Sequence, residues 1–419
     1  MQTADSTTIA DLAWWEFYSD STLCKIIRHT LDHNRDILKA AATVEEMRHL
    51  YGIEKVNLAP TLNGIAGATH ETNDYYGEPY KKDPEFSLKA TVGWEVNMWG
   101  ALSWARKQSK AKFEASREDL RAMRMTLIAE VATTYFRLLA LDNELAIVRQ
   151  TLATREEALN QARIRFEGGL TPETVFQQAK VEYASTASLV PDLERRITVC
   201  QNALTLLMGE FPEDMIERGS FALRITLPDS LPTGLPSTLL KRRPDVRAAE
   251  YRLAAAMSNV GLTYADRFPT FKLAFTGGWE NDELTNFLKS PFSYTLGNIT
   301  GSIFDFGRKK RKYKAAVEAC NQACYTYEQS VIRAFTEVND AITTLHKKHD
   351  ATLLQSELSE AAKEYVRLAT LQYRGGSLNY LDVLDAQRRY FDAQIGVNNA
   401  LLGEYLALIH LYKSLGGWN

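Results

Sequence analysis

Two long stretches of the chain have a seven-residue apolar repeat, which is clear in the first and weaker in the second, where Thr352 and Ser359 interrupt it. The two stretches run from Ala101 to Glu167 and from Arg308 to Arg374, and neither contains a glycine or a proline. The clearest apolar series, in the first stretch, is Val131, Leu138, Leu145, Leu152, Leu159 and Phe166. A seven-residue repeat is typical of helices that wind around one another, as in a coiled coil or a helical barrel. At a rise of about 1.5 Å per residue, each stretch predicts a helix about 100 Å long.

A pair of glycines follows each long stretch, and the two pairs are 207 positions apart. The pairs are Gly168 with Gly169, and Gly375 with Gly376. Glycine readily takes the left-handed conformation that ends many helices. Thr171, which precedes Pro172, and Ser377 are predicted to start the returning helices. We therefore expect two long helical hairpins. Their ranges are 101–209, with the tip at 168–171, and 308–415, with the tip at 375–378.

Apolar and polar residues alternate with a period of two in the ranges 57–98 and 269–306, which predicts two strands in each range. The apolar series comprises Phe86, Leu88, Val92, Trp94, Phe271, Leu273, Phe275 and Trp279. The alternate series contains the charged residues Lys89, Glu95, Lys272 and Glu280. The partner strands, near Leu58–Thr69 and Phe292–Phe306, alternate less cleanly. The second of them changes parity near Gly297, which a β-bulge would explain.

This alternation leaves two kinds of sheet open. A soluble antiparallel sheet with one wet face shows it, and so do the strands of a membrane β-barrel. Four strands cannot close a barrel, and an open edge would leave backbone groups unpaired in lipid. If these strands cross a membrane, several chains must therefore share one barrel.

The same order of elements occurs twice along the chain. Each copy reads as a helix, two strands, a very long helix, a Gly-Gly turn and a returning helix. The first copy covers residues 1–210 and the second covers residues 237–419, with a Pro-rich linker at 211–236. The predicted fold class is mixed α and β, built from two tandem repeats.

Composition and charge narrow the classes of protein that remain. A formal net charge of −3 gives no electrostatic reason to expect a nucleic-acid partner. No apolar run reaches the roughly 18 residues of a membrane-spanning helix. The N-terminal residues lack the basic and apolar regions of a signal peptide. We therefore expect either a cytoplasmic protein or a sequence that begins after processing.

Residues with catalytic or metal-binding chemistry form no diagnostic pattern. The four cysteines and the histidine pairs have spacings that match no metal site or disulfide framework. The sequence contains no Gly-rich phosphate loop and no nucleophile elbow. We therefore expect no metal, no cofactor and no enzymatic activity.

Four segments together resemble a known family. They are "WWEFYSDSTLCKIIRHTLDHNRDI" near the start, "GLPSTLLKRRPDVRAAEYRLAAAMSNVGLTYADRFPTFKL" from Gly234, "IFDFGRKK" after the fourth predicted strand, and "YRGGSLNYLDVLDAQRRY" at the second tip. In this combination and order the chain is similar to the outer-membrane factors of the TolC family, in the NodT/OprM-like efflux lipoprotein branch. The lipid-bearing cysteine of that branch is missing, since no lipobox precedes Cys24.

The resemblance implies a homotrimer in the outer membrane of a Gram-negative bacterium. Three chains would form a twelve-stranded transmembrane β-barrel and a twelve-helix tunnel through the periplasm. The polar strand faces would line the barrel lumen, and the apolar faces would meet outer-membrane lipid. The implied partners are a periplasmic adaptor and an inner-membrane pump, which dock at the helical tips.

The resemblance also implies a periplasmic gate at the second tip. Asp382 and Asp385 match the family's acidic pair, and Tyr373 matches a tyrosine that helps to tie the closed tip together. Leu378 departs from relatives that carry an arginine there, so closure here is expected to depend on Tyr373 and on packing more than on ion pairs. On the residues alone, without the resemblance, solvated surface acids are the favoured interpretation of the two aspartates.

The function expected from these observations is a passive exit duct of a tripartite efflux or secretion system. The alternative is a soluble periplasmic coiled-coil adaptor or scaffold protein, because long helical hairpins suit both. The paired amphipathic strands favour the duct, since an adaptor does not need them.

Overall fold

The computed structural model describes residues 13–18, 20–73, 76–77, 81–212, 216–219, 221 and 240–417. Most of the predicted linker at 211–236 lies outside the described residues. The chain divides into two compact units, and each draws on both sequence repeats. The first unit comprises the described residues of 1–40, 120–246 and 331–419, and the second comprises those of 41–119 and 247–330.

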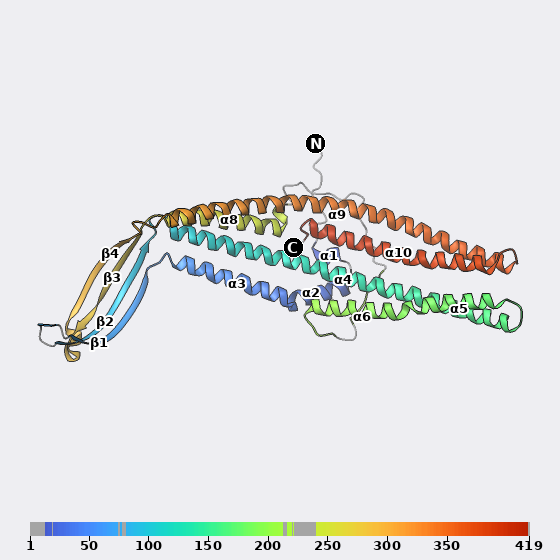
Figure 1. Ribbon diagram of the computed structural model, residues 1–419, viewed down its shortest axis with the longest axis horizontal. Coiled ribbons are helices and arrows are strands. Elements are labelled where there is room, and N and C mark those ends of the chain that lie inside the picture. Colours follow the sequence, from blue (N-terminus) through green and yellow to red (C-terminus); the bar gives the residue numbers. More distant parts are fainter. Residues whose placement is uncertain are drawn as a thin grey trace, which may run out of the picture. The chain divides into compact units, whose positions relative to one another are not determined.

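The helices follow the predicted order closely (Figure 1). The first unit contains α1 (Trp14–Phe17), α2 (Ser21–His33), α5 (Glu173–Ala187), α6 (Leu189–Met208) and α10 (Tyr380–Ser414). The helices α3 (Arg35–Val56) and α8 (Pro244–Ala265) belong mostly to the second unit. The predicted long helices are α4 (Ala101–Glu167) and α9 (Arg308–Arg374), each uninterrupted over 67 residues, and both contribute to both units.

The first predicted hairpin has a break that the sequence analysis did not anticipate. Its returning arm is interrupted between α5 and α6 at Ser188, whereas α10 runs without interruption. Pro191 explains the difference, because a proline has no N–H to donate and its ring collides with the carbonyl four residues earlier. Asn398 occupies the equivalent position in the second repeat. The backbone of Ser188 stays in the right-handed helical region, so the interruption is shallow.

Both hairpin tips close in the same way. The N–H of Leu170 donates to the carbonyl of Arg165, and the N–H of Ser377 donates to the carbonyl of Gln372. Gly169 and Gly376 take positive φ angles of 71° and 76°, as this helix ending requires.

The starts of the returning helices differ from the predicted ones. The helix α10 begins at Tyr380 with Asn379 as its N-cap, so the expectation that Ser377 starts it is wrong. The Ser377 hydroxyl instead donates to the carbonyl of Gln372 at the end of α9. The helix α5 begins at Glu173 after Pro172, and Thr171 contributes no cap.

The strands form one antiparallel sheet in the order β1-β2-β3-β4 (Figure 1). They are β1 (Thr61–Asn73), β2 (Lys81–Val96), β3 (Thr270–Asn281) and β4 (Pro291–Thr300). Directly opposed residues share a face, so Thr91 and Thr276 lie on one face and Val92 and Phe275 on the other. The register therefore gives the sheet a polar face and an apolar face across its two central strands.

The fourth strand differs from its prediction in two ways. Pairing between β3 and β4 runs one residue to one residue through Gly297, so the expected bulge there is wrong. Strand β4 also ends at Thr300 rather than continuing to Phe306, which has a positive φ of 52°. Without a bulge, the apolar residues of β4 before Gly297 stay on the polar face of the sheet.

The main core of the first unit joins helices from both repeats. The heptad residues Val131, Leu138 and Leu145 are buried in it, together with side chains of α2, α6 and α10. At its edge the Tyr135 hydroxyl donates to Asp20 at 2.8 Å and accepts from the Gly219 N–H at 2.8 Å. Burial raises the pKa of Tyr135, so this hydroxyl stays protonated and able to donate.

None of the helices in the described part of the chain combines the length and the hydropathy that crossing a bilayer requires.

The left-handed glycine at the second tip gives a test of this geometry. In Gly376→Ala, a β-carbon forced into the left-handed region should cost about 1–2 kcal/mol. The amide of Ser377, which closes the tip, should then exchange its hydrogen roughly 5–30 times faster, as measured by hydrogen–deuterium exchange. Gly375→Ala is the matched control, because its β-carbon meets only the carbonyl oxygens of Gln372 and Leu371, at ordinary distances of 3.5 and 3.6 Å. Equal exchange rates in the two variants would contradict the left-handed conformation of Gly376.

Candidate functional site at the hairpin tips

The candidate site lies where the two hairpin tips meet within the first unit. The ends of α4 and α9 and the starts of α5 and α10 converge there (Figure 1). The Arg165 guanidinium, at the end of α4, donates to the Tyr373 hydroxyl at 2.9 Å, at the end of α9. This hydrogen bond joins the first hairpin to the second.

The tyrosine expected to tie the tip also lies in an apolar cluster. Its ring packs with Val366 and Leu378 around the buried side chains of Ala369, Val383 and Ala386. The ring centroid of Tyr380 is 5.7 Å away. Leu378 therefore contributes apolar packing to the tip, and its uncharged side chain makes no ion pair there.

The two predicted gate carboxylates each have a partner at the start of α10. Asp382 accepts from the backbone N–H of Asn379 at 3.2 Å and forms a capping box with it. Asp385 accepts from Nε of Arg389 at 2.7 Å, and this hydrogen bond raises the pKa of Arg389. Both carboxylates are partly exposed. The hydrogen bonds and ion pair that these two side chains make are within the second hairpin, and other residues make the polar connection to the first hairpin.

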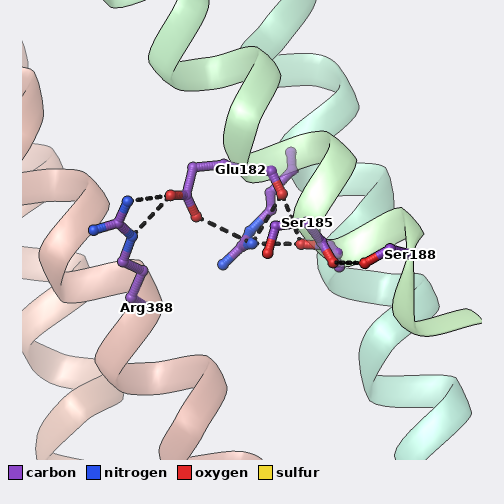
Figure 2. Close-up of polar contacts among 6 residues, drawn as sticks. Glu182, Ser185, Ser188 and Arg388 are labelled. Carbon is purple, nitrogen blue, oxygen red and sulfur yellow. Dashed lines mark hydrogen bonds and ion pairs between the residues drawn. The ribbon is translucent and has the colours of Figure 1, made fainter.

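A buried carboxylate that the sequence analysis did not single out links the hairpins. Glu182 on α5 is only 6% exposed, and its Oε1 accepts from Nε of Arg388 on α10 at 2.8 Å. Figure 2 shows Arg388 reaching from α10 to the Glu182 carboxylate. A second guanidinium, that of Arg155 on α4, lies 3.1 Å from the other carboxylate oxygen. We call these three residues the Glu182 cluster.

The Glu182 cluster is held from several sides. Nη1 of Arg155 also donates to the Glu182 carbonyl at 3.0 Å and to the Thr186 hydroxyl. The Arg155 guanidinium lies 5.5 Å from the centre of the Phe391 ring on α10. Burial lowers the pKa of Arg155, while the hydrogen bond with Glu182 raises the pKa of Arg388. One carboxylate thus serves two guanidinium groups, of which Arg155 is the more buried.

Only a weak sequence signal marks this cluster. Glu182 follows Ala179 by three positions and precedes Thr186 by four, so one face of α5 combines small residues with a single acid. Such a face leaves room for a guanidinium. Its partner Arg388 is 206 residues away along the chain, and no local pattern connects the two.

The charged residues predicted in the strands pair with one another. Nζ of Lys89 lies 2.8 Å from Glu280, and Nζ of Lys272 lies 3.6 Å from Glu95. Both pairs bridge β2 and β3 on the polar face. The opposite face carries the predicted apolar series Phe86, Leu88, Val92, Trp94, Phe271, Leu273, Phe275 and Trp279. No group of three or more metal-ligating side chains occurs within the described ranges.

Comparisons with known proteins identify the family. The family model described as outer membrane efflux protein matches residues 26–210 and again 235–417. The solvent efflux pump outer membrane protein SrpC of Pseudomonas putida is 31% identical over 96% of this chain and 86% of its own length.

Solved structures agree with this match. The outer-membrane channel OprN has a TM-score of 0.92 at 26% identity, over 100% of this chain and 94% of its own. The open state of the Neisseria gonorrhoeae MtrE outer membrane channel has a TM-score of 0.84 at 29% identity, over 99% and 94% of the two chains.

The fold, the location and the role of the chain follow from these matches. The fold is that of the TolC-like channels, and the protein is an efflux channel of a Gram-negative outer membrane. The alternative of a soluble adaptor is therefore wrong. With its two family-model matches and its full-length similarity to a curated relative, the chain belongs to the outer membrane efflux protein family.

Proposed function

We propose that three copies of this chain form the exit duct of a tripartite efflux system and that the hairpin tips close it at the periplasmic end. The free edges of the sheet support an assembly of several copies of the chain. In the described part of the chain, β1 and β4 each pair with one neighbour only. Lipid would leave the free edges of these two strands without hydrogen-bond partners, so other copies must supply them.

The two faces of the sheet suit a barrel wall. The polar face, with the Lys89–Glu280 and Lys272–Glu95 pairs, would line a water-filled lumen. The apolar face would meet lipid, with Trp94 and Trp279 as candidate anchors at the membrane interface. Glu85 lies on the same face and is 3.6 Å from Lys89, so this face carries more acids than bases along the path.

Energy and most of the substrate choice would come from the partners. The described residues contain no group of three or more His, Cys, Asp or Glu side chains that could hold a metal ion. An inner-membrane pump and a periplasmic adaptor would deliver the exported compound to the tips. The channel would then pass it outward passively.

Closure of the tip would rest on contacts between the two hairpins. The Arg165–Tyr373 hydrogen bond is exposed, and such a bond contributes about 0.5–1.5 kcal/mol. In the Glu182 cluster the contact between the hairpins is the Glu182–Arg388 ion pair. Its carboxylate is 9% exposed and its guanidinium 57% exposed, so its contribution lies between those of a surface pair and a fully buried one. We therefore assign the larger share of closure to the Glu182 cluster, with Tyr373 and its apolar packing in support. This revises the expectation that ion pairs play the smaller part.

The acidic pair would act on permeating ions. Three copies would bring six carboxylates of Asp382 and Asp385 to one constriction, where rings of acids favour cations. The ion pair with Arg389 offsets part of the charge of Asp385. The selectivity for cations should accordingly be moderate.

Single-channel recording in a planar bilayer tests the duct and its acidic ring together. The purified protein should give small, cation-selective steps. The double variant Asp382→Asn/Asp385→Asn should change their size or lower their selectivity, because it removes the carboxylate charge. Equal conductance in both proteins would keep the duct and exclude the acidic ring. Silence from both, with folding confirmed by circular dichroism, would contradict the duct itself.

A second recording tests closure by the Glu182 cluster. Glu182→Gln should raise the open probability or the conductance several-fold, since Arg155 and Arg388 then lose their shared anion. The matched control is Glu194→Gln, which removes an exposed ion pair with Arg149 inside a single hairpin. The proposal fails if both substitutions have the same effect. Tyr373→Phe should raise conductance less than Glu182→Gln, because it removes one exposed hydrogen bond and keeps the ring.

A further inference from the structure

The polar face of the sheet is polar only at its centre. On β2 and β3 this face carries the two charge pairs and the hydroxyls of Thr91 and Thr276, which lie 2.9 Å apart. Its two edges carry apolar side chains. They are Ile65 on β1 and Phe292, Tyr294 and Leu296 on β4.

The strand register fixes these side chains to that face. Ile65 lies opposite Lys89, and Tyr294 lies opposite Thr276. The rings of Phe292 and Tyr294 stack with centroids 6.1 Å apart, and Nζ of Lys89 lies 5.7 Å from the Phe292 ring centre.

The apolar side chains at the two edges are exposed to solvent in a single chain. Ile65 is 57% exposed, Tyr294 is 52% exposed and Leu296 is 46% exposed. A lumen filled with water gives such residues no apolar contact. The β4 edge of this face therefore carries a row of three apolar side chains, and the β1 edge carries Ile65 among polar neighbours; a single sheet leaves them uncovered.

We infer that these residues form an apolar seam inside the barrel, where β4 of one copy meets β1 of the next. This inference rests on the proposed trimer. Pairing two edge strands brings directly opposed side chains on one face to within about 5.5 Å. Ile65 of one copy then covers the aromatic and leucine side chains of its neighbour, three times around the barrel.

The shapes of the two edges also fit each other. Next to Ile65 on the same face of β1 lies Gly67, which has no side chain. The Ser87 hydroxyl lies 3.2 Å from where a β-carbon would stand at Gly67, so the recess is shallow. A ring from the neighbouring copy would lie over it, as aromatic residues cover edge glycines in other sheets. A bound apolar solute would need only one of these surfaces. The presence of complementary surfaces on both edges favours a second copy as the occupant.

Cysteine cross-linking tests the seam. The four native cysteines, Cys24, Cys200, Cys320 and Cys324, are first replaced by alanine. Ile65→Cys is then combined in turn with Phe292→Cys, Tyr294→Cys and Leu296→Cys. Within one chain these sites are about 14 Å apart across three strand spacings, beyond the roughly 7 Å reach of a disulfide. Any disulfide therefore joins two copies.

The expected result is a covalent trimer on a non-reducing gel for at least one of the three pairs. The control is Ile65→Cys with Thr295→Cys, because Thr295 points to the opposite face from a neighbouring position on β4. Absence of cross-links in all three same-face pairs, or equal cross-linking in the control, would overturn the seam.

The mass of the detergent-extracted protein separates the seam from the proposed function. A trimer without same-face cross-links overturns the seam and leaves the duct standing, and the apolar edges would then face the lumen uncovered. A monomer of the cysteine-free parent, when the unmodified protein is also a monomer, overturns the trimer and the seam with it. A trimer cross-linked only through the same-face pairs supports both.

Discussion

The unpaired edges of the sheet are the constraint on which this protein depends. A backbone N–H or carbonyl in hydrocarbon has no water to bond with, so strands in a bilayer must close on one another. One chain supplies β1 to β4 and no more within its described residues. On the proposed function the working unit is an assembly of several copies, in which edge residues such as Ile65 and Leu296, exposed in one chain, would be covered. The same edges would favour aggregation in water, where nothing covers them.

The two repeats have the same order of elements but carry different residues at the positions that contact each other. Pro191 interrupts the returning arm of the first, while Asn398 at the matching place donates to the Ala140 carbonyl and lies buried. The tip contacts are divided in the same way. The first repeat supplies the buried acid Glu182, and the second supplies Arg388, one position away from the matching residue. A duplicated hairpin thus becomes a pair whose members bind each other through unlike residues.

Much of the fold could be predicted because its signals are local. The heptads of α4, the Gly-Gly pairs and the period of two in β2 and β3 each lie within one element. The predictions that were wrong concern places where a local pattern is compatible with two structures. At Gly297 the change in parity reflects apolar residues on the polar face and not a bulge, and only the pairing with β3 decides that. Asp382 lies three residues after Asn379, a spacing that already suggests a helix cap. The Glu182 cluster could not be predicted, because its members come from helices that only the fold brings together.

The burial of Glu182 affects how strongly the contacts at the tip depend on the salt concentration around the channel. Small ions pass freely through porins, so the ionic strength around the tips follows that of the medium. Dissolved salt weakens exposed ion pairs such as Asp385–Arg389 but screens buried ones much less. If the Glu182 cluster closes the tip as proposed, closure would depend less on dissolved salt than it would with exposed ion pairs alone. On that proposal, the leak through the closed channel would vary little with the salinity outside the cell.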